Sequence, residues 1–297
     1  MTGLRRILTV TVIAAFFIVA FLGLVLGPNL PRNLHPTRDD QCEPLATDKD
    51  PKAVVLEPQN TWSNLGYLIV GSVILYRSRN LLGAAVGLNL AFEFLFSGLY
   101  HSKLTESMQF IDVAWIYVLL LSLIACAVQC VVVRFHDPAR ETERPVFSNR
   151  NFLIALAIAA GTVFIGIMMR VIRPNSTWTT IFLAGVLAVA VSYKYVWEFL
   201  SNRIQAIWPP KLLPPWHTAD IVAVILIFAF GLPALVCRFS DGPDHWSLFD
   251  WCVRDEGRLQ AHAVWHVTSA FLVLAVYDFF GHYFPEQGRV FANWGDD

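Results

Sequence analysis

The feature that most constrains this chain is a series of long apolar runs joined by short polar connections. The runs lie at about 8–26, 61–76, 81–100, 110–133, 152–172, 178–199, 219–238 and 260–280. A helix of about 20 apolar residues is long enough to cross a bilayer. Only helices and closed barrels satisfy their backbone hydrogen bonds within lipid. The pattern therefore predicts an all-α integral membrane protein, a seven-transmembrane helix bundle preceded by an additional N-terminal anchor helix.

Composition agrees with a membrane protein and excludes one class of partner. Of the 297 residues, 56% are hydrophobic and only 15% are charged, whereas about a quarter of the residues in a soluble domain are charged. The formal net charge of −1 argues against nucleic acid as a partner. The sequence leaves the oligomeric state open.

Four regions follow from this pattern, beginning with the anchor helix at residues 1–27. Arg5 and Arg6 precede its apolar run, as in a signal peptide, but the run is long and no A-x-A site follows. We expect an uncleaved anchor, with a cleaved signal peptide as the alternative. Residues 28–59 are too polar for lipid and form an extramembrane acidic loop. Residues 60–282 form the bundle, and 283–297 form a C-terminal tail.

Orientation is predicted from the distribution of Lys and Arg, which favour the cytoplasmic side. The N-terminal pair Arg5 and Arg6, together with the basic loop 134–150, favours a cytoplasmic N-terminus. The second bundle span then ends, and the seventh begins, at the non-cytoplasmic face. We therefore expect a multi-pass protein whose site lies toward that face.

Three histidines are predicted to meet at this depth. His262 and His266 are four residues apart, so both rings lie on one face of a helix. The second bundle span carries a stripe of polar residues spaced four apart, namely Asn89, Glu93, Ser97 and His101. Such a stripe faces the bundle interior, because lipid does not accept it. We assign Asn89 and Glu93 to interhelical hydrogen bonding, and Ser97 and His101 to a site shared with the histidine pair.

These residue types suit metal-assisted hydrolysis. Three imidazoles and one open position are typical of a catalytic zinc site, and zinc lowers the pKa of a bound water to about 7. Asp112 lies just inside the third span, where its carboxylate can take the proton of that water and pass it to a leaving amine. The Ser97 hydroxyl can donate to the oxyanion that forms on the attacked carbonyl.

Two non-enzymatic alternatives use the same histidines. One is a haem-binding electron-transfer bundle with histidine axial ligands, which would give no role to Ser97 or Asp112. The other is a receptor or transporter in which zinc is structural, and such a site would close with a fourth protein ligand. Isolated histidines within a helix also occur as ordinary core residues.

The ordered set of motifs resembles the alkaline ceramidases, within a superfamily of membrane hydrolases that includes the adiponectin receptors. The matching pieces are residues 57–64 (EPQNTWSN), the Ser-x-x-x-His of Ser97 and His101, then Asp112, and the HxxWH-like pattern of His262 and His266. The resemblance covers about 40–280. It implies zinc bound by the three histidines, with Ser97 and Asp112 assisting catalysis.

The activity implied by this resemblance is hydrolysis of a linear amide C–N bond. The family cleaves ceramide, a membrane lipid, to sphingosine and a free fatty acid, so the chain would act in sphingolipid metabolism. Another N-acyl lipid would fit the same chemistry. The sequence does not select the chain length or the headgroup of the substrate.

The resemblance also implies a calcium site and a disulfide outside the bundle. The residues that align with the calcium ligands are Asp40, Gln41, Glu43 and Glu57, and carboxylate and carbonyl oxygens suit that ion. Leu45 stands where the family has an asparagine, and the loop is longer, so a solvated acidic loop is the alternative. Cys42 and Cys252 lie in polar loops on the same predicted side and are the expected disulfide pair.

Overall fold

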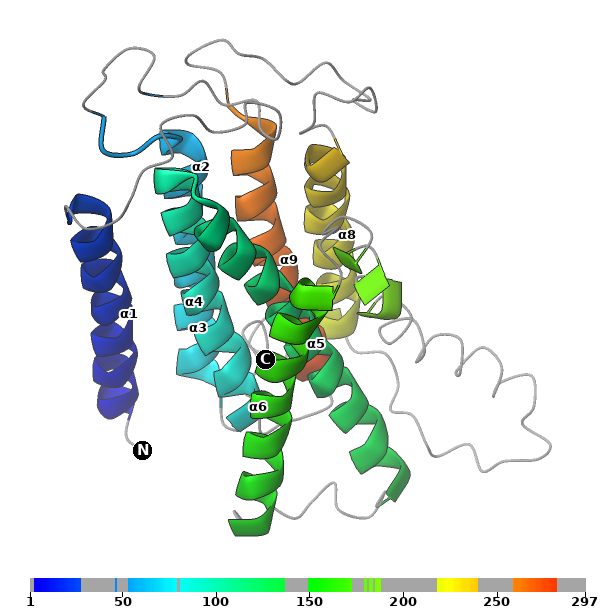
Figure 1. The fold of residues 1–297 in the computed structure, drawn as a ribbon. Helices are drawn as coiled ribbons and strands as arrows, with labels where there is room; N and C mark the ends of the chain where they lie inside the picture. Colours follow the sequence, from blue (N-terminus) through cyan, green and yellow to red (C-terminus); the bar gives the residue numbers. More distant parts are fainter. Residues whose placement is uncertain are drawn as a thin grey trace.

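The described part of the computed structural model covers residues 3–27, 46, 53–78, 81–136, 149–172, 179–180, 182–183, 185–187, 218–239 and 259–281. Regular secondary structure within these residues is helical throughout, which confirms the all-α class. The helices are α1 (Gly3–Leu26), α2 (Pro58–Ser63), α3 (Leu65–Arg77), α4 (Leu81–Lys103), α5 (Glu106–His136), α6 (Asn149–Ile172), α8 (Thr218–Phe239) and α9 (Ala261–Gly281) (Figure 1).

Among the described residues, four segments are long and apolar enough to cross a membrane, and they indicate a membrane protein. They are Leu4–Leu26, Leu81–Lys103, Glu106–Ala127 and Ala261–Phe279. Shorter apolar helices run over Leu156–Ile172 and Val222–Arg238. The predicted span 178–199 lies mostly outside the described residues, so the count of seven spans stays a prediction.

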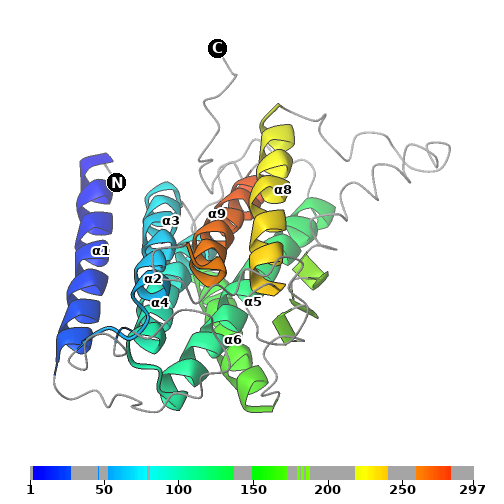
Figure 2. The same ribbon diagram turned by 90° about the horizontal axis from the view of Figure 1, so that it is seen from above.

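Helix α9 lies at the centre of the arrangement, between α3 and α8 (Figure 2). Helix α4 packs between α3 and α5, and α6 packs on α5. Helix α1 stands at one side of the bundle, against α3 and α4. This order brings the C-terminal end of α4 beside the N-terminal end of α9, which are the ends that carry the predicted ligands.

Two glycines allow α3 and α4 to approach each other closely away from the site. A Cβ atom on Gly71 would lie 2.7 Å from the Gly87 carbonyl oxygen, and one on Gly87 would lie 2.7 Å from Leu75 Cγ. Small residues at such crossings let helix backbones meet within a membrane. Around them, Ile74, Val86 and Leu90 are fully buried, so this end of the helix pair is packed and apolar.

The turn between α4 and α5 is short and contains an unusual backbone conformation. Leu104 has φ +52°, which lies in the left-handed region. Many helices end with a residue in this region, and that residue is usually glycine. Its side chain packs with Leu56 and Tyr100, which gives a reason for a leucine at this position. The Thr105 hydroxyl then accepts from the Met108 N–H at 3.4 Å and caps the start of α5. Helix α5 therefore begins at Glu106, directly after the turn, and Asp112 lies alongside α4.

Candidate metal centre

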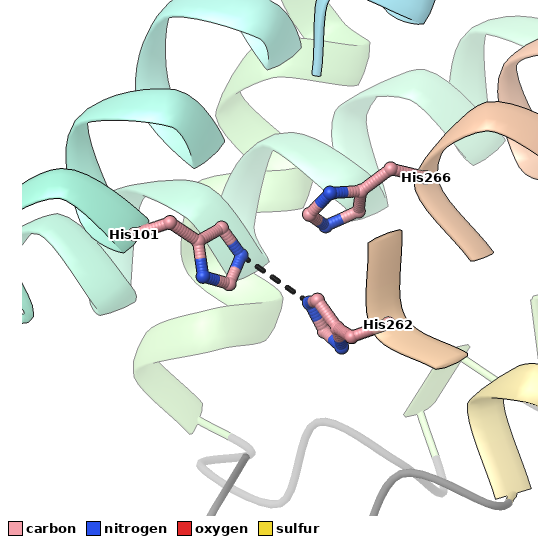
Figure 3. Close-up of side chains that lie close together, drawn as sticks. All are labelled: His101, His262 and His266. Atoms are coloured by element: carbon pink, nitrogen blue, oxygen red, sulfur yellow. Dashed lines mark hydrogen bonds between the residues drawn. The ribbon is translucent and has the colours of Figure 1, made fainter. Parts of the chain in front are cut away.

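Three histidine rings from two helices point toward one another at one end of the bundle (Figure 3). His101 lies in the last turn of α4, and His262 and His266 lie in the first two turns of α9. The Nε2 atoms of His101 and His262 are 3.2 Å apart. One ligand atom from each of the three buried rings lies within 4.8 Å of the others, so together they could hold a metal ion.

The unpartnered nitrogen of His266 fits a metal centre. His266 is fully buried, and its Nε2 atom has no hydrogen-bond partner. A buried polar atom without a partner is costly, and such atoms are rare in native proteins. A metal ion held between the rings would satisfy this nitrogen.

Glu57 orients the His101 ring. Its Oε2 atom lies 2.7 Å from His101 Nδ1, so Nδ1–H donates to the carboxylate and Nε2 keeps its lone pair for a metal. The carboxylate is held in place by the backbone, because the Glu57 N–H donates to the His101 carbonyl at 3.1 Å. The Asn60 side-chain amide also donates to Oε2, at 3.3 Å.

Residues of α2 orient His266 in the same way. Its Nδ1 atom lies 3.2 Å from the Asn60 carbonyl oxygen and 2.9 Å from Ser63 Oγ. Donation from Nδ1–H to that carbonyl leaves Nε2 free to bind a metal. Glu57, the residue directly before α2, and α2 itself thus supply partners to histidines on two different helices.

These partners are not evident from the sequence. The family resemblance aligns Glu57 with calcium ligands, and Asn60 and Ser63 belong to the motif at 57–64 without an individual role. The available signal was a carboxylate, an amide and a hydroxyl directly before an apolar run, at the membrane face predicted for the histidines. Carboxylates and carbonyls of this kind commonly orient metal-binding histidines.

The two predicted catalytic residues lie beside the histidines. Ser97 and Asp112 are both buried, and the Ser97 hydroxyl hydrogen-bonds the Asp112 carboxylate. Asp112 Oδ1 has no hydrogen-bond partner. Asp112 is also close enough to His101 to interact with it electrostatically. The structure therefore brings these two residues together with the three predicted ligands.

The remaining residues of the polar stripe on α4 behave differently from each other. Asn89 donates from Nδ2 to Ser122 Oγ on α5 at 2.8 Å, which confirms the predicted interhelical hydrogen bond. Glu93 is 1% exposed, its Oε2 atom has no partner, and it interacts electrostatically with Asp112. Buried polar side chains therefore continue along α4 for about one helical turn beyond Ser97, toward the N-terminal end of the helix.

The predicted calcium site and disulfide fall largely outside the described residues. This applies to Asp40, Gln41, Cys42, Glu43, Leu45 and Cys252, so both features stay predictions. Glu57 is described, and its Oε2 atom is engaged with His101.

The geometry thus defines a candidate metal centre made of three histidine rings, the orienting residues Glu57, Asn60 and Ser63, and an adjacent hydroxyl–carboxylate pair. Comparisons of the chain with protein-family models, with curated proteins and with solved structures find no match.

Proposed function

We propose that this protein is a zinc-dependent intramembrane hydrolase that cleaves the amide bond of ceramide, releasing sphingosine and a free fatty acid. The observation that carries the proposal is the convergence of three buried imidazoles from two helices beside a buried hydroxyl–carboxylate pair. The proposal includes a multi-pass, seven-helix bundle after α1, with the site toward the non-cytoplasmic face.

The donor set supports zinc as the metal. Zinc–imidazole bonds of about 2.0–2.1 Å in tetrahedral geometry place two ligating nitrogens roughly 3.3 Å apart. The 3.2 Å between the Nε2 atoms of His101 and His262 agrees with that spacing. Three neutral nitrogen ligands leave a fourth position for water or substrate, as in catalytic zinc sites.

Asp112 and Ser97 have complementary roles in an amide hydrolysis. Zinc, when bound, supplies Lewis-acid chemistry at the carbonyl and makes a water molecule more acidic. The unpartnered Oδ1 of Asp112 takes the proton of the attacking water and then returns it to the departing amine nitrogen. The Ser97 hydroxyl holds Asp112 in place, and it can turn to donate to the oxygen of the attacked carbonyl.

The surroundings of the site support a lipid substrate. The ligands lie on helices that are apolar along most of their length, so a molecule that reaches them from the bilayer carries apolar chains. The proton transfers suit an amide bond, because its nitrogen must be protonated in order to leave. Ceramide meets both conditions, and so do other N-acyl lipids.

A lipid panel separates ceramide from the alternatives. Purified protein is incubated with ceramide, an N-acylethanolamine and an N-acyl amino acid, with and without a zinc chelator, and released fatty acid is measured. Chelator-sensitive release from ceramide alone is expected. Release from another N-acyl lipid alone would support zinc-dependent amide hydrolysis but contradict ceramide as the substrate. Absence of release from every lipid by zinc-loaded protein would contradict hydrolysis.

A further inference from the structure

Helix α1 is docked on the bundle through side chains that fit a specific place on α4. Phe17, Phe21 and Val25 are at most 3% exposed. The Phe21 ring lies 5.1 Å from the ring of Phe94 between centroids. A Cβ atom on Gly98 would lie 2.9 Å from Phe21 Cε2, so the absence of a side chain at Gly98 makes the space that Phe21 fills.

A buried lysine joins the C-terminal end of α1 to α4. Lys103 is 2% exposed, and its Nζ atom donates to the Val25 carbonyl at 2.7 Å. The last carbonyls of a helix lack N–H partners within it, and a cation is favourable at that end. Lysine is seldom fully buried, because its charge is costly to remove from water. The contact therefore satisfies both the helix end and the ammonium group.

The same lysine reaches the segment that carries Glu57. Lys103 Nζ also donates to the Val54 carbonyl, at 3.5 Å. Beyond Val54, the Leu56 N–H donates to the Ser102 carbonyl at 3.2 Å, and Glu57 follows with its contacts to His101. A continuous set of contacts thus runs from α1 through Lys103 and residues 54–57 to a predicted zinc ligand.

We propose that α1 is a permanent helix of the folded protein and that Lys103 is a positioning residue. By holding the end of α1 and residues 54–57 together, Lys103 keeps the Glu57 carboxylate against His101 Nδ1. The second half of this proposal rests on the proposed zinc centre. The first half does not, because the docking of α1 depends only on its contacts with α4.

Cutting the chain after α1 tests the docking. A protease recognition sequence is inserted between residues 30 and 40, and the purified full chain is cleaved in detergent. We expect the α1 fragment to stay with the bundle through gel filtration. Gly98→Leu should release it, because the new side chain takes the place of Phe21. Gly161→Leu is the matched control, since a Cβ there meets nothing within 4 Å.

Two results would overturn the docking of α1. One is release of the fragment from the otherwise unchanged protein. The other is an intact mass showing that the purified mature protein lacks residues 3–27. Should Gly98→Leu fail to fold, Phe21→Ala serves as the second variant, and it should weaken retention of the fragment.

A double-mutant cycle on zinc affinity tests the positioning role of Lys103. Loss of a group that orients a ligand costs about 10–100-fold in metal affinity, so Glu57→Gln should weaken zinc binding by that factor. Lys103→Met should weaken it in the same direction, and the double variant should bind no more weakly than Glu57→Gln alone. A chelator competition measures the affinities.

The outcomes of this cycle separate the two proposals. If the loss of zinc affinity in the double variant equals the product of the two single losses, Lys103 does not act through Glu57. That result would overturn the positioning role. Failure of the unsubstituted protein to bind zinc would contradict the metal centre and the positioning role together, while the cleavage experiment would still decide the docking of α1. Zinc binding without lipid hydrolysis would contradict only the proposed function.

Discussion

The two ends of α4 are built on opposite principles. Near its N-terminal end, Gly87 meets Gly71 of α3 almost backbone to backbone, among side chains that are apolar and fully buried. Near its C-terminal end, the helix presents Glu93, Ser97 and His101 to α5 and α9. The first end is packed around two glycines and buried apolar side chains, whereas the second end is buried and polar.

Unsatisfied polar atoms gather at the second end. Glu93 Oε2, Asp112 Oδ1 and His266 Nε2 are all buried without a hydrogen-bond partner. Such atoms are few in native proteins, and each one lowers stability. These atoms lie close to the three histidines, so the proposed function assigns metal binding and chemistry to this end of α4 and packing to the glycine end.

Removing one of the three histidines should abolish both zinc binding and lipid hydrolysis at the C-terminal end of α4. His266→Ala takes away a ring that is fully buried and faces the other two, so two ligands remain where catalytic zinc sites use three. We expect zinc content and lipid hydrolysis to fall to background, as measured by elemental analysis and fatty-acid release. Val267→Ala is the control, because its side chain is 38% exposed on the same helix. Full zinc content in His266→Ala would contradict the site.

Asp112→Asn should separate catalysis from metal binding. The amide keeps the shape of the side chain but cannot accept a proton from water, and general acid–base catalysis contributes about 10²–10⁴-fold in rate. We expect kcat to fall by that factor while zinc content stays unchanged. Glu106→Gln in the exposed first turn of the same helix is the matched control. Unchanged kcat in Asp112→Asn would exclude this carboxylate from the mechanism.

Gly87→Leu should lower the stability of the protein by disrupting the packing of α4 against α3. The new side chain would collide with Leu75 Cγ and with the Gly71 carbonyl oxygen, at 2.7 and 2.9 Å from its Cβ. Overpacking of this kind costs about 1–3 kcal/mol of stability, or more when backbone is involved. A lowered unfolding temperature in detergent, followed by tryptophan fluorescence, is the measurement, with Gly161→Leu as the control. Equal unfolding temperatures for the two variants would show that the crossing tolerates a side chain.

Asn89→Ala should have the smallest effect, because Asn89 lies between the two ends. The substitution removes the hydrogen bond to Ser122, and such bonds contribute about 0.6 kcal/mol in membrane helices. We expect a slight loss of stability with unchanged zinc content and unchanged hydrolysis. Ser122→Ala should give a similar loss, and the double variant should add little. A tenfold loss of hydrolysis in Asn89→Ala would extend the active region beyond Glu93.

The sequence predicted the clustering of the three histidines because that clustering depends on helical periodicity. The spacing of His262 and His266 puts two rings on one face, and the membrane depth of the predicted spans brings His101 to the same level. Both inferences use only helix geometry and the cost of polar groups in lipid. The all-helical class followed from the same apolar runs.

The partners supplied by Glu57 and α2 were not predictable in the same way. The bond from His101 to Glu57 joins residues 44 positions apart, and it depends on how residues 54–57 turn back onto the end of α4. No periodicity encodes such a turn, and the same carboxylate was equally compatible with a calcium site. The docking of α1 could not be predicted from the sequence for a similar reason. The hydrophobicity of Phe21 and the small size of Gly98 do not show that the two residues are neighbours.

The abrupt turn at Leu104 limits how this chain can be altered over evolution or by design. Each residue added to the chain at the start of α5 and taken up in the helix would rotate the rest of α5 by about 100° and move it about 1.5 Å along its axis. A single insertion would therefore swing Asp112 away from Ser97, although neither residue had been replaced. We expect this connection to tolerate changes of side chain but no change of length.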